Sequence, residues 1–358
     1  MIKKVLTLGL GKVGTLVGVL LSRQFEVTGM DRHQPHYTYT FPFDIVTGDV
    51  TNAEFMQELI AAHDAVVSAL PYFLNKTIAK IAHQEGKGYF DLTEDVETTK
   101  YIRRLSKSSS SVMAPQCGLA PGIIGIIGAD LAKDFEALRS VEMRVGALPR
   151  YPNSRLGYAF NWSPAGVINE YINDAEAIVD GEQKQVQSLQ GKEVIYIEGT
   201  AYEAFYTSGG LGTMCETYNG RVKQLNYKTI RYPGHCDLMN FLIHELHLKN
   251  SKSQLEDLLK NAKPEVAEDT VIIYAAAEGW QEGKLKRNEF CRSYGPIEIE
   301  KQTWRAISWT TAASLVAVVE MVANGTLPSK GFIKQEEISL EKLLATETGN
   351  LFHTGILK

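Results

Sequence analysis

Three glycines near the N-terminus have a spacing that suits phosphate binding. Gly9-x-Gly11-x-x-Gly14 follows the short run Val5–Leu8 and precedes apolar residues at a 3.6-residue period. A strand, a tight turn and a helix are therefore expected. The first glycine permits the turn, the second lets a pyrophosphate approach the backbone, and the third lets helix and strand lie close together. The helix N-terminus then offers N–H groups to the phosphates.

An acidic residue follows the glycine loop at the spacing expected for a dinucleotide-binding unit. A second expected strand, Glu26–Met30, ends at Asp31, twenty residues after Gly11. Its carboxylate can accept hydrogen bonds from both hydroxyls of an adenosine ribose, so the two features together predict a dinucleotide-binding unit. Because a carboxylate repels a 2′-phosphate, we expect NAD, with NADP as the alternative. Arg32 is either a solvated surface charge or a cation that stacks on adenine or meets a 2′-phosphate.

Further cofactor contacts are expected where later strands of this unit end. Ala65–Leu70 is typical of a buried parallel strand, and ligands bind at the carboxyl edge of such sheets. Asp49 and Val50 fall where an adenine-contacting pair would lie, although a plain strand end is equally compatible. Thr51 and Glu54 have the spacing of a capping box, which predicts a helix start. The expected cofactor-binding residues are Gly9, Gly11, Lys12, Val13, Gly14, Asp31, Arg32, Asp49, Val50, Ala69, Leu70 and Pro71.

Three polar side chains could act on a substrate. Asp91, near the end of an expected strand, could orient or deprotonate an amine, or cap the next helix. Arg231 could hold a carboxylate through two parallel hydrogen bonds, or form a surface ion pair. His235 could serve as acid or base, or make a structural hydrogen bond. No Ser-His-Asp or Cys-His order suggests covalent catalysis, and hydride transfer needs none.

Several segments combine glycine, aromatic and polar residues more densely than core packing needs. They span residues 157–164, 208–213 and 229–235. Glycine lets the backbone approach a ligand, and the other residues supply donors and apolar walls. Cys117, in a glycine- and proline-containing loop, either contacts substrate or nicotinamide or is a small buried thiol. The expected substrate-binding residues are Cys117, Gly118, Leu119, Asn161, Trp162, Gly212, Thr213 and Arg231.

The order of elements predicts an α/β protein of two domains. Strands and helices alternate six times up to Pro115, the pattern of a doubly wound parallel Rossmann sheet. From Val141 onward, period-two alternation predicts an α+β domain with a mixed or antiparallel sheet. A long apolar helix, Trp304–Ala323, is expected to return to the first domain. We therefore expect a dinucleotide-binding domain over 1–120, completed by about 303–358, and a substrate domain over 121–302.

Composition limits the partners. The chain has 358 residues, 44% apolar and 22% charged, with a net charge of −5. This balance is typical of a soluble globular protein and gives no electrostatic reason to expect nucleic acid or an anionic membrane. We expect no signal peptide and no apolar run long enough to cross a bilayer. The four cysteines are scattered without metal-type spacing, so we expect a reduced, cytoplasmic protein without a metal site.

Motifs through most of the chain resemble the saccharopine dehydrogenase family, which includes lysine 6-dehydrogenases and carboxynorspermidine-type reductases. They are the glycine loop with Asp31-Arg32, and the segments 67–71, 89–93, 118–122, 160–167, 210–213 and 228–235. The resemblance implies nicotinamide-dependent redox chemistry at a C–N bond of an amino acid, and a dimer formed through the second domain. It also implies that Asp91 and residues 118–122 line the cleft, while Arg231 reaches the substrate carboxylate.

Two departures from the family pattern bear on the substrate. Ala165 stands where an arginine is expected in the glutamate-forming fungal enzymes, and residues 331–334 lack the proline-rich ending usual after the last long helix. Both favour the bacterial lysine-dehydrogenase-like branch. We therefore expect an NAD(P)-dependent oxidoreductase with lysine 6-dehydrogenase or saccharopine dehydrogenase activity. A carboxynorspermidine-type imine reductase and a non-catalytic NAD-sensing protein are the alternatives.

Overall fold

The computed structural model describes residues 2–34, 40–262 and 265–357. It divides into two compact units. The first comprises Met1–Ile123 and Ser308–Thr354, and the second Ile124–Ile307 and Gly355–Lys358. The first boundary thus lies at 123/124 where 120/121 was expected, and the return lies at 307/308 where about 302/303 was expected. The last four residues belong to the second unit.

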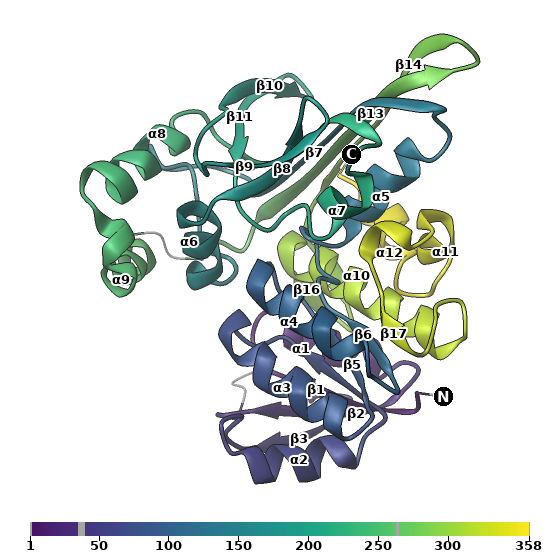
Figure 1. The fold of residues 1–358 in the computed structure, drawn as a ribbon. Coiled ribbons are helices and arrows are strands. Elements are labelled where there is room, and N and C mark those ends of the chain that lie inside the picture. The colour runs from purple at the N-terminus through teal and green to yellow at the C-terminus, as the bar shows by residue number, and fades with distance from the viewer. Residues whose placement is uncertain (1, 35–39, 263–264, 358) are drawn as a thin grey trace. The chain divides into compact units, whose positions relative to one another are not determined.

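The first unit is built on a seven-stranded parallel sheet with the order β17-β6-β5-β4-β1-β2-β3 (Figure 1). Its sequence order reverses between β1 and β4, which is the switch point where such sheets bind ligands. A short seventh strand after the long apolar helix was not predicted from the sequence. The strands are β1 (Lys4–Leu8), β2 (Glu26–Asp31), β3 (Asp44–Thr47), β4 (Ala65–Ser68), β5 (Gly88–Asp91), β6 (Val112–Ala114) and β17 (Gly331–Phe332).

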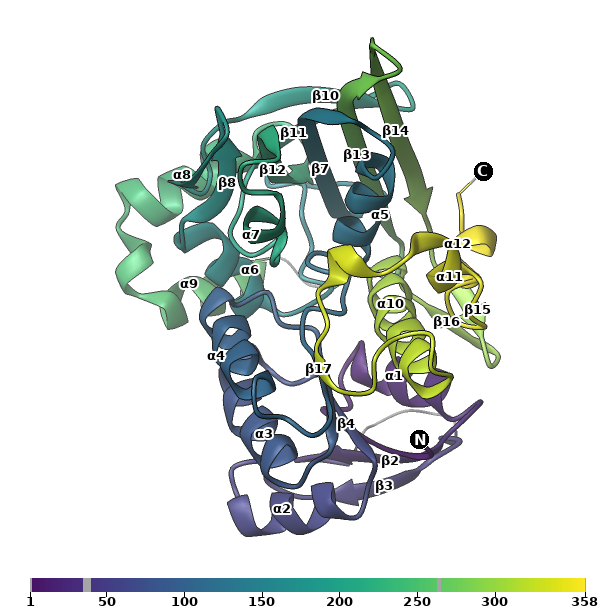
Figure 2. The same cartoon turned by 45° about the vertical axis from the view of Figure 1, so that its right-hand side comes forward.

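Helices cover both faces of this sheet. Buried side chains of α2, α3 and α4 pack on one face, against residues such as Leu6, Leu8 and Val66. Figures 1 and 2 show α1 and α10 on the other face. The helices are α1 (Gly14–Leu21), α2 (Ala53–Ala61), α3 (Tyr72–Gln84), α4 (Val96–Ser106), α10 (Ala306–Ala323), α11 (Leu340–Leu344) and α12 (Leu351–Thr354), with a 3-10 turn at Gln335–Glu337.

Two local expectations for these helices are corrected. The residue that caps α2 is Asn52, whose side chain accepts from Phe55 N, whereas the hydroxyl of Thr51 donates to Asp49. The capping box at Thr51 is therefore wrong by one residue. The expectation that no apolar run is long enough to cross a bilayer is also wrong, because α10 has the length and the apolar composition to do so. In the structure 89% of its residues are buried, as in the core helix of a globular protein.

The second unit holds an eight-stranded mixed sheet with the order β10-β11-β12-β7-β13-β14, and β8 and β9 beside β12. Only β7 and β12 among its pairs run parallel. The strands are β7 (Ala137–Pro149), β8 (Ala175–Val179), β9 (Glu182–Val186), β10 (Glu193–Ile197), β11 (Thr200–Tyr206), β12 (Val222–Arg231), β13 (Asp269–Gln281) and β14 (Lys284–Tyr294). A separate two-stranded sheet contains β15 (Ile297–Ile299) and β16 (Gln302–Trp304). The polar strand β9 was not predicted.

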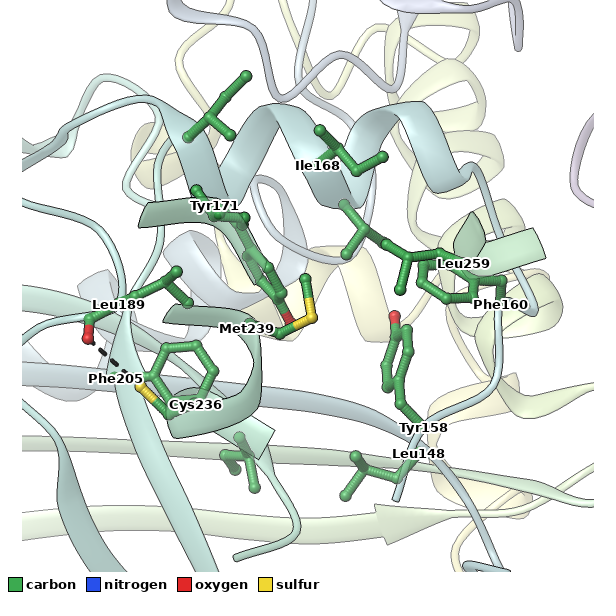
Figure 3. Close-up of a cluster of buried hydrophobic side chains, with 14 of the residues drawn as sticks. Leu148, Tyr158, Phe160, Ile168, Tyr171, Leu189, Phe205, Cys236, Met239 and Leu259 are labelled. Atoms are coloured by element: carbon green, nitrogen blue, oxygen red, sulfur yellow. Dashed lines mark hydrogen bonds between the residues drawn. The ribbon is translucent and has the colours of Figure 1, made fainter. Parts of the chain in front are cut away.

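The helices of the second unit are α5 (Ile123–Ala132), α6 (Pro164–Ile172), α7 (Met214–Tyr218), α8 (His235–Asn240) and α9 (Lys252–Ala262). Of these, α6, α8 and α9 contribute side chains to one large apolar cluster. Helix α8 continues directly into a π-helix at Phe241–Glu245. The expected start of α10 at Trp304 is two residues early, because Trp304 ends β16. Figure 3 shows Tyr158 and Tyr171 within the apolar cluster, with Phe205, Cys236 and Met239.

Candidate functional site

The glycine loop of the first unit, between β1 and α1, has space for a side chain at one of its three glycines and none at another. Gly9 adopts a left-handed backbone with φ of 85°. A methyl group on Gly14 would stand 1.8 Å from the Gly9 carbonyl oxygen and 2.9 Å from the Ala69 Cβ, so only glycine fits. A methyl group on Gly11 would meet nothing within 4 Å. The loop is thus tight where the backbone turns and open at Gly11, where a pyrophosphate must approach.

The acid expected to bind the ribose is held against this loop. Asp31 Oδ2 accepts from Leu10 N at 2.7 Å, and its Oδ1 accepts from His33 N at 3.1 Å. Arg32 Nη2 lies 2.9 Å from Asp49 Oδ2, so this cation has a carboxylate partner before any ligand binds. Hydrogen bonds from Thr51 are the main reason that the pKa of Asp49 is lowered. Asp31 therefore fits the expected ribose contact, whereas Arg32 and Asp49 form an exposed ion pair.

The other expected cofactor residues lie around the same loop. Gly9 approaches the carbonyl of Ala69 and the side chain of Leu70, so the end of β4 lies beside the glycine turn. Pro71 immediately precedes α3. Lys12 and Val13 lead into α1, which has no acidic residue in its first turn. These residues lie at the carboxyl edge of the sheet, where open α/β folds bind ligands.

Asp91 lies at the carboxyl end of β5 and is completely buried. Its carboxylate accepts three hydrogen bonds, from Tyr89 Oη, Thr93 N and Gln116 N, at 2.7–3.0 Å. Burial raises its pKa to about 6 against these hydrogen bonds. Asp91 therefore holds the loop after β6, and this placement does not favour the expected role on an amine.

Two more carboxyl groups follow Asp91, and sequence reasoning did not single them out. Asp95 caps α4, where its Oδ2 accepts from Thr98 N and Thr98 Oγ1. Glu94 is half-buried as a residue, but its Oε1 is enclosed and has no hydrogen-bond partner in the described part of the chain. Burial raises the pKa of Glu94 to about 7. No motif marked Glu94, because an unsatisfied oxygen is a property of the folded neighbourhood.

The loop after β6 is part of the interior of the first unit. Cys117 is buried, and its Sγ donates to the Ala114 carbonyl at 3.1 Å. Gln335 Nε2 donates to the Pro115 carbonyl and contacts Cys117 Sγ at 3.4 Å. Burial raises the pKa of the Cys117 thiol, so it stays protonated. Cys117 matches the buried-thiol interpretation; Leu119 is also buried.

Arg231 is the buried cation of the second unit, with only 2% of its surface exposed. Its Nε donates to Tyr171 Oη at 2.9 Å and its Nη1 to the Ile230 carbonyl at 2.8 Å. The guanidinium also lies over the ring of Tyr158, 4.6 Å from the centroid. Nη2 has no hydrogen-bond partner among the residues that the structure describes. Arg231 is therefore a buried, oriented guanidinium, and the surface ion pair is excluded.

His235 stands beside this cation in a chain of hydrogen bonds. Its Nε2 lies 3.0 Å from Tyr171 Oη, and its Nδ1 lies 2.8 Å from the Leu156 carbonyl. Since the Leu156 carbonyl can only accept, Nδ1 carries the proton and donates to it, and the Nε2 of the neutral ring then accepts from the Tyr171 hydroxyl. Burial, and then the charge of Arg231, lower the pKa of His235 to about 3. A neutral imidazole with both nitrogens engaged positions Tyr171 and does not favour an acid–base role.

The remaining expected substrate residues support this cluster or lie apart from it. Trp162 Nε1 donates to Tyr158 Oη at 3.0 Å and so orients the ring that covers Arg231. Asn161 Oδ1 accepts from Val266 N, which gives it a structural role. Gly212 has φ of 56° and precedes Thr213 at the start of α7. No group of three His, Cys, Asp or Glu side chains that could hold a metal occurs among the described residues.

A parallel sheet with a glycine loop beside its switch point is typical of dinucleotide-binding domains. The chain belongs to the saccharopine dehydrogenase family. The family's NADP binding domain matches residues 5–115, and its C-terminal domain matches residues 118–348. This confirms the family resemblance and the α/β fold class, and it identifies NAD(P) as the cofactor of the first unit.

Curated relatives align with part of the chain. Alpha-aminoadipic semialdehyde synthase of Rattus norvegicus is 31% identical over 199 residues, which are 50% of this chain and 21% of that protein. Saccharopine dehydrogenase [NADP(+), L-glutamate-forming] of Schizosaccharomyces pombe is 23% identical over 218 residues, 54% of this chain and 46% of the relative. The chain thus covers less than half the length of these two relatives.

A solved structure shares the whole fold. Apo saccharopine dehydrogenase (L-Glu forming) from Saccharomyces cerevisiae superposes with a TM-score of 0.76, covering 99% of each chain at 16% identity. At this identity the similarity concerns the fold alone.

Proposed function

We propose that the protein is an NAD(P)-dependent dehydrogenase that acts on the C–N bond of a lysine-derived amino acid. The observation that carries the proposal is Arg231, a guanidinium 2% exposed whose hydrogen bonds to described residues use Nε and Nη1. A guanidinium held in this way can offer its remaining N–H groups to an anion. A carboxylate matches the planar fork in charge and geometry.

The substrate carboxylate would bind Arg231 Nη2 while Tyr171 and Tyr158 keep the guanidinium in place. Tyr171 fixes Nε, and Tyr158 covers one face of the planar group. Bound dinucleotide supplies a hydride acceptor or donor. Gly11 and the N-terminus of α1 would hold its pyrophosphate, and Asp31 would hold the adenosine ribose. We propose NAD as the preferred form, because the Asp31 carboxylate stands at the loop and Asp49 neutralises Arg32.

The direct test is absorbance at 340 nm with purified protein, NAD or NADP, and lysine or saccharopine added separately. Turnover of either substrate would support the proposal. Turnover of lysine alone would identify an ε-dehydrogenating enzyme and would agree with Ala165 in place of the arginine expected in the glutamate-forming enzymes. Turnover of saccharopine alone would identify a saccharopine dehydrogenase. The assay should be repeated in the reductive direction with an imine-forming aldehyde and amine pair, because a carboxynorspermidine-type reductase would respond only there.

A result without turnover in either direction would overturn the dehydrogenase proposal. If NADH still bound with micromolar affinity, the protein would instead be an NAD-sensing protein. Binding without turnover is thus the outcome that separates these two functions.

We also propose a homodimer formed through the sheet of the second unit. Supporting it, Val194 and Tyr196 on the edge strand β10 are 64% and 75% exposed, and large apolar side chains at a sheet edge favour association. Light scattering coupled to gel filtration is expected to give twice the monomer mass, and Tyr196→Glu is expected to reduce it. A wild-type monomer at micromolar concentration would refute the dimer.

A reducing, cytoplasmic setting is proposed on the basis of the cysteines. All four are free, and three of them are buried. Mass spectrometry of protein alkylated at lysis is expected to show four modified thiols after unfolding. A disulfide in freshly isolated protein would contradict this setting.

A further inference from the structure

Three charged side chains lie together where β2 and β3 end, at the carboxyl edge of the first unit's sheet. The two strands are parallel, with Asp31 opposite Thr47, and Gly48 N donates to the Asp31 carbonyl at 3.0 Å. The residues that follow these strands therefore reach the same place. Arg32 Nη2 lies 2.9 Å from Asp49 Oδ2 there. Beside the acid expected to bind the ribose, the edge thus carries a guanidinium and a second carboxylate.

The two carboxylates are held in place by donors of their own. Asp31 accepts from Leu10 N and His33 N, one bond to each oxygen. Asp49 Oδ1 accepts from Thr51 N at 2.9 Å and from Thr51 Oγ1 at 2.7 Å, which leaves Oδ2 for the guanidinium. These bonds are also the main reason that the pKa of Asp49 is lowered, so it is ionised at neutral pH. Both negative charges are therefore fixed features of this edge.

Arg32 is the member of the group that can move. Its side chain is 71% exposed, against 39% for Asp49. An ion pair this exposed contributes little to stability, and a long side chain in water can leave its partner at small cost. A phosphate monoester carries more negative charge than a carboxylate and accepts two parallel hydrogen bonds from a guanidinium. Asp49 and a phosphate would therefore compete for the same cation.

We infer that Asp49 is a specificity-determining residue for the coenzyme, because it holds Arg32 away from the 2′-phosphate of NADP. While the Arg32–Asp49 pair is formed, a 2′-phosphate meets the Asp31 carboxylate without a free cation beside it. Once the pair is broken, Arg32 can bind that phosphate. This inference rests on the proposed preference for NAD and adds a second determinant to Asp31.

The two acids would act in different ways, and this difference can be measured. Asp31 would contact the ribose hydroxyls, so its loss would weaken NADH as well as relieve repulsion of a phosphate. Asp49 would act through Arg32 and would contact neither coenzyme. Neutralising Asp49 should therefore strengthen NADPH binding and leave NADH binding as it is.

The test is a double-mutant cycle of Asp49→Asn, Arg32→Gln and the double variant, titrated with NADH and with NADPH by fluorescence. Asparagine still accepts from Thr51, so the turn before α2 is kept. We expect Asp49→Asn to lower the NADPH dissociation constant about 10-fold and to change that of NADH by less than about 2-fold. In the Arg32→Gln background, Asp49→Asn should change the NADPH value by less than about 2-fold.

A second probe and a control variant isolate the cause. Adenosine 2′,5′-bisphosphate, which lacks the nicotinamide half, should show the same gain as NADPH in a competition assay. Asp237→Asn removes a carboxylate from another exposed ion pair, in which Lys192 Nζ lies 2.6 and 2.8 Å from the two oxygens. Neither dissociation constant should change in that variant. An equal gain there would show a long-range charge effect and would overturn the role of Asp49.

The remaining outcomes separate this role from the preference for NAD. A gain in NADPH affinity that is equal with and without Arg32 would mean direct repulsion by Asp49 and would overturn the inference. Parallel weakening of NADH and NADPH in Asp49→Asn would place Asp49 on the adenine and would also overturn it. Unchanged NADPH affinity in Asp49→Asn would reject the role of Asp49 and leave the preference for NAD standing.

The converse result is equally distinct. Tighter binding of NADPH than NADH by the wild type would overturn the preference for NAD. The role of Asp49 would still hold if the gain in Asp49→Asn required Arg32, and would fail if it did not.

Discussion

At the scale of single residues, Arg231 is the side chain that we propose to bind the substrate carboxylate. Arg231→Lys keeps the charge but loses the planar fork and most of the contact with Tyr158. We expect the KM for the amino-acid substrate to rise about 10–100-fold, with the NADH dissociation constant unchanged. Steady-state kinetics and a fluorescence titration measure these quantities.

The chain offers a matched control for this substitution. Arg292 also donates from Nη1 to the carbonyl of the preceding residue, and it lies 5.4 Å from the ring of Phe290. Arg292→Lys makes the same chemical change at an exposed position, so its KM should stay at the wild-type value. Equal KM values for Arg231→Lys and wild type would remove Arg231 from the substrate site.

Asp31 is the residue that we expect to set the preference between NAD and NADP. Asp31→Ser removes the negative charge that repels a 2′-phosphate and the two oxygens that the ribose hydroxyls would reach. We expect the ratio of NADPH to NADH affinity to rise by at least about 10-fold in a fluorescence titration. Asp44→Ser, at the exposed start of β3, is the control. Tighter binding of NADPH than NADH by the wild type would overturn the preference for NAD.

At the scale of the element, two glycines in the turn from β1 into α1 allow stability and cofactor binding to be tested separately. Gly14→Ala would place a methyl group 1.8 Å from the Gly9 carbonyl oxygen, so strand and helix must move apart. We expect it to lower the free energy of unfolding by about 1–3 kcal/mol, as overpacking does. Thermal and urea unfolding of the variant would measure this loss.

Gly11→Ala is the paired substitution in the same turn. Its methyl group meets no atom within 4 Å, so the stability should change by less than about 0.5 kcal/mol. The methyl group would instead occupy the space of the pyrophosphate, and NADH binding should weaken at least about 10-fold. Wild-type affinity in Gly11→Ala would show that the phosphates bind elsewhere.

At the scale of the whole molecule, buried His235 makes stability depend on pH. Its pKa is about 3 in the folded protein, against 6.5 for the free side chain. The unfolded chain therefore binds the proton first, and this contribution to stability, complete above pH 6.5, is lost as the pH falls toward 3. The slope is about 1.4 kcal/mol per pH unit over that window.

Urea unfolding at several pH values tests this dependence. Asp91 changes the stability in the opposite direction between pH 3.8 and 6. Its pKa is raised to about 6 in the folded protein, so its contribution to stability increases as the pH falls. The informative quantity is therefore the difference between wild type and His235→Asn, which lacks the titrating group. That difference should shrink as the pH falls from 6.5 toward 3; a constant difference would show that His235 does not titrate in this way.

Much of the architecture followed from sequence patterns because those patterns are local. The glycine spacing, the acid after the second strand and the alternating elements predicted the parallel sheet, and the change to period-two alternation predicted a mixed sheet. The strand β17, with only Gly331 and Phe332, and the polar strand β9 were missed, since neither has an apolar pattern. Their pairing depends on partners distant in the chain.

The sequence by itself determined the glycine loop between β1 and α1 and the acid at Asp31, and it singled out Arg231 as a candidate. These features depend on residue type and spacing, which can be read from the sequence alone. Only the tertiary structure decided which polar atoms are already satisfied. Asp91 and His235 have suitable side chains for proton transfer, but folding surrounds them with partners, whereas Glu94 keeps an oxygen free of partners in the described chain. Hydrogen-bond satisfaction depends on groups far apart in sequence, so no local pattern could reveal it.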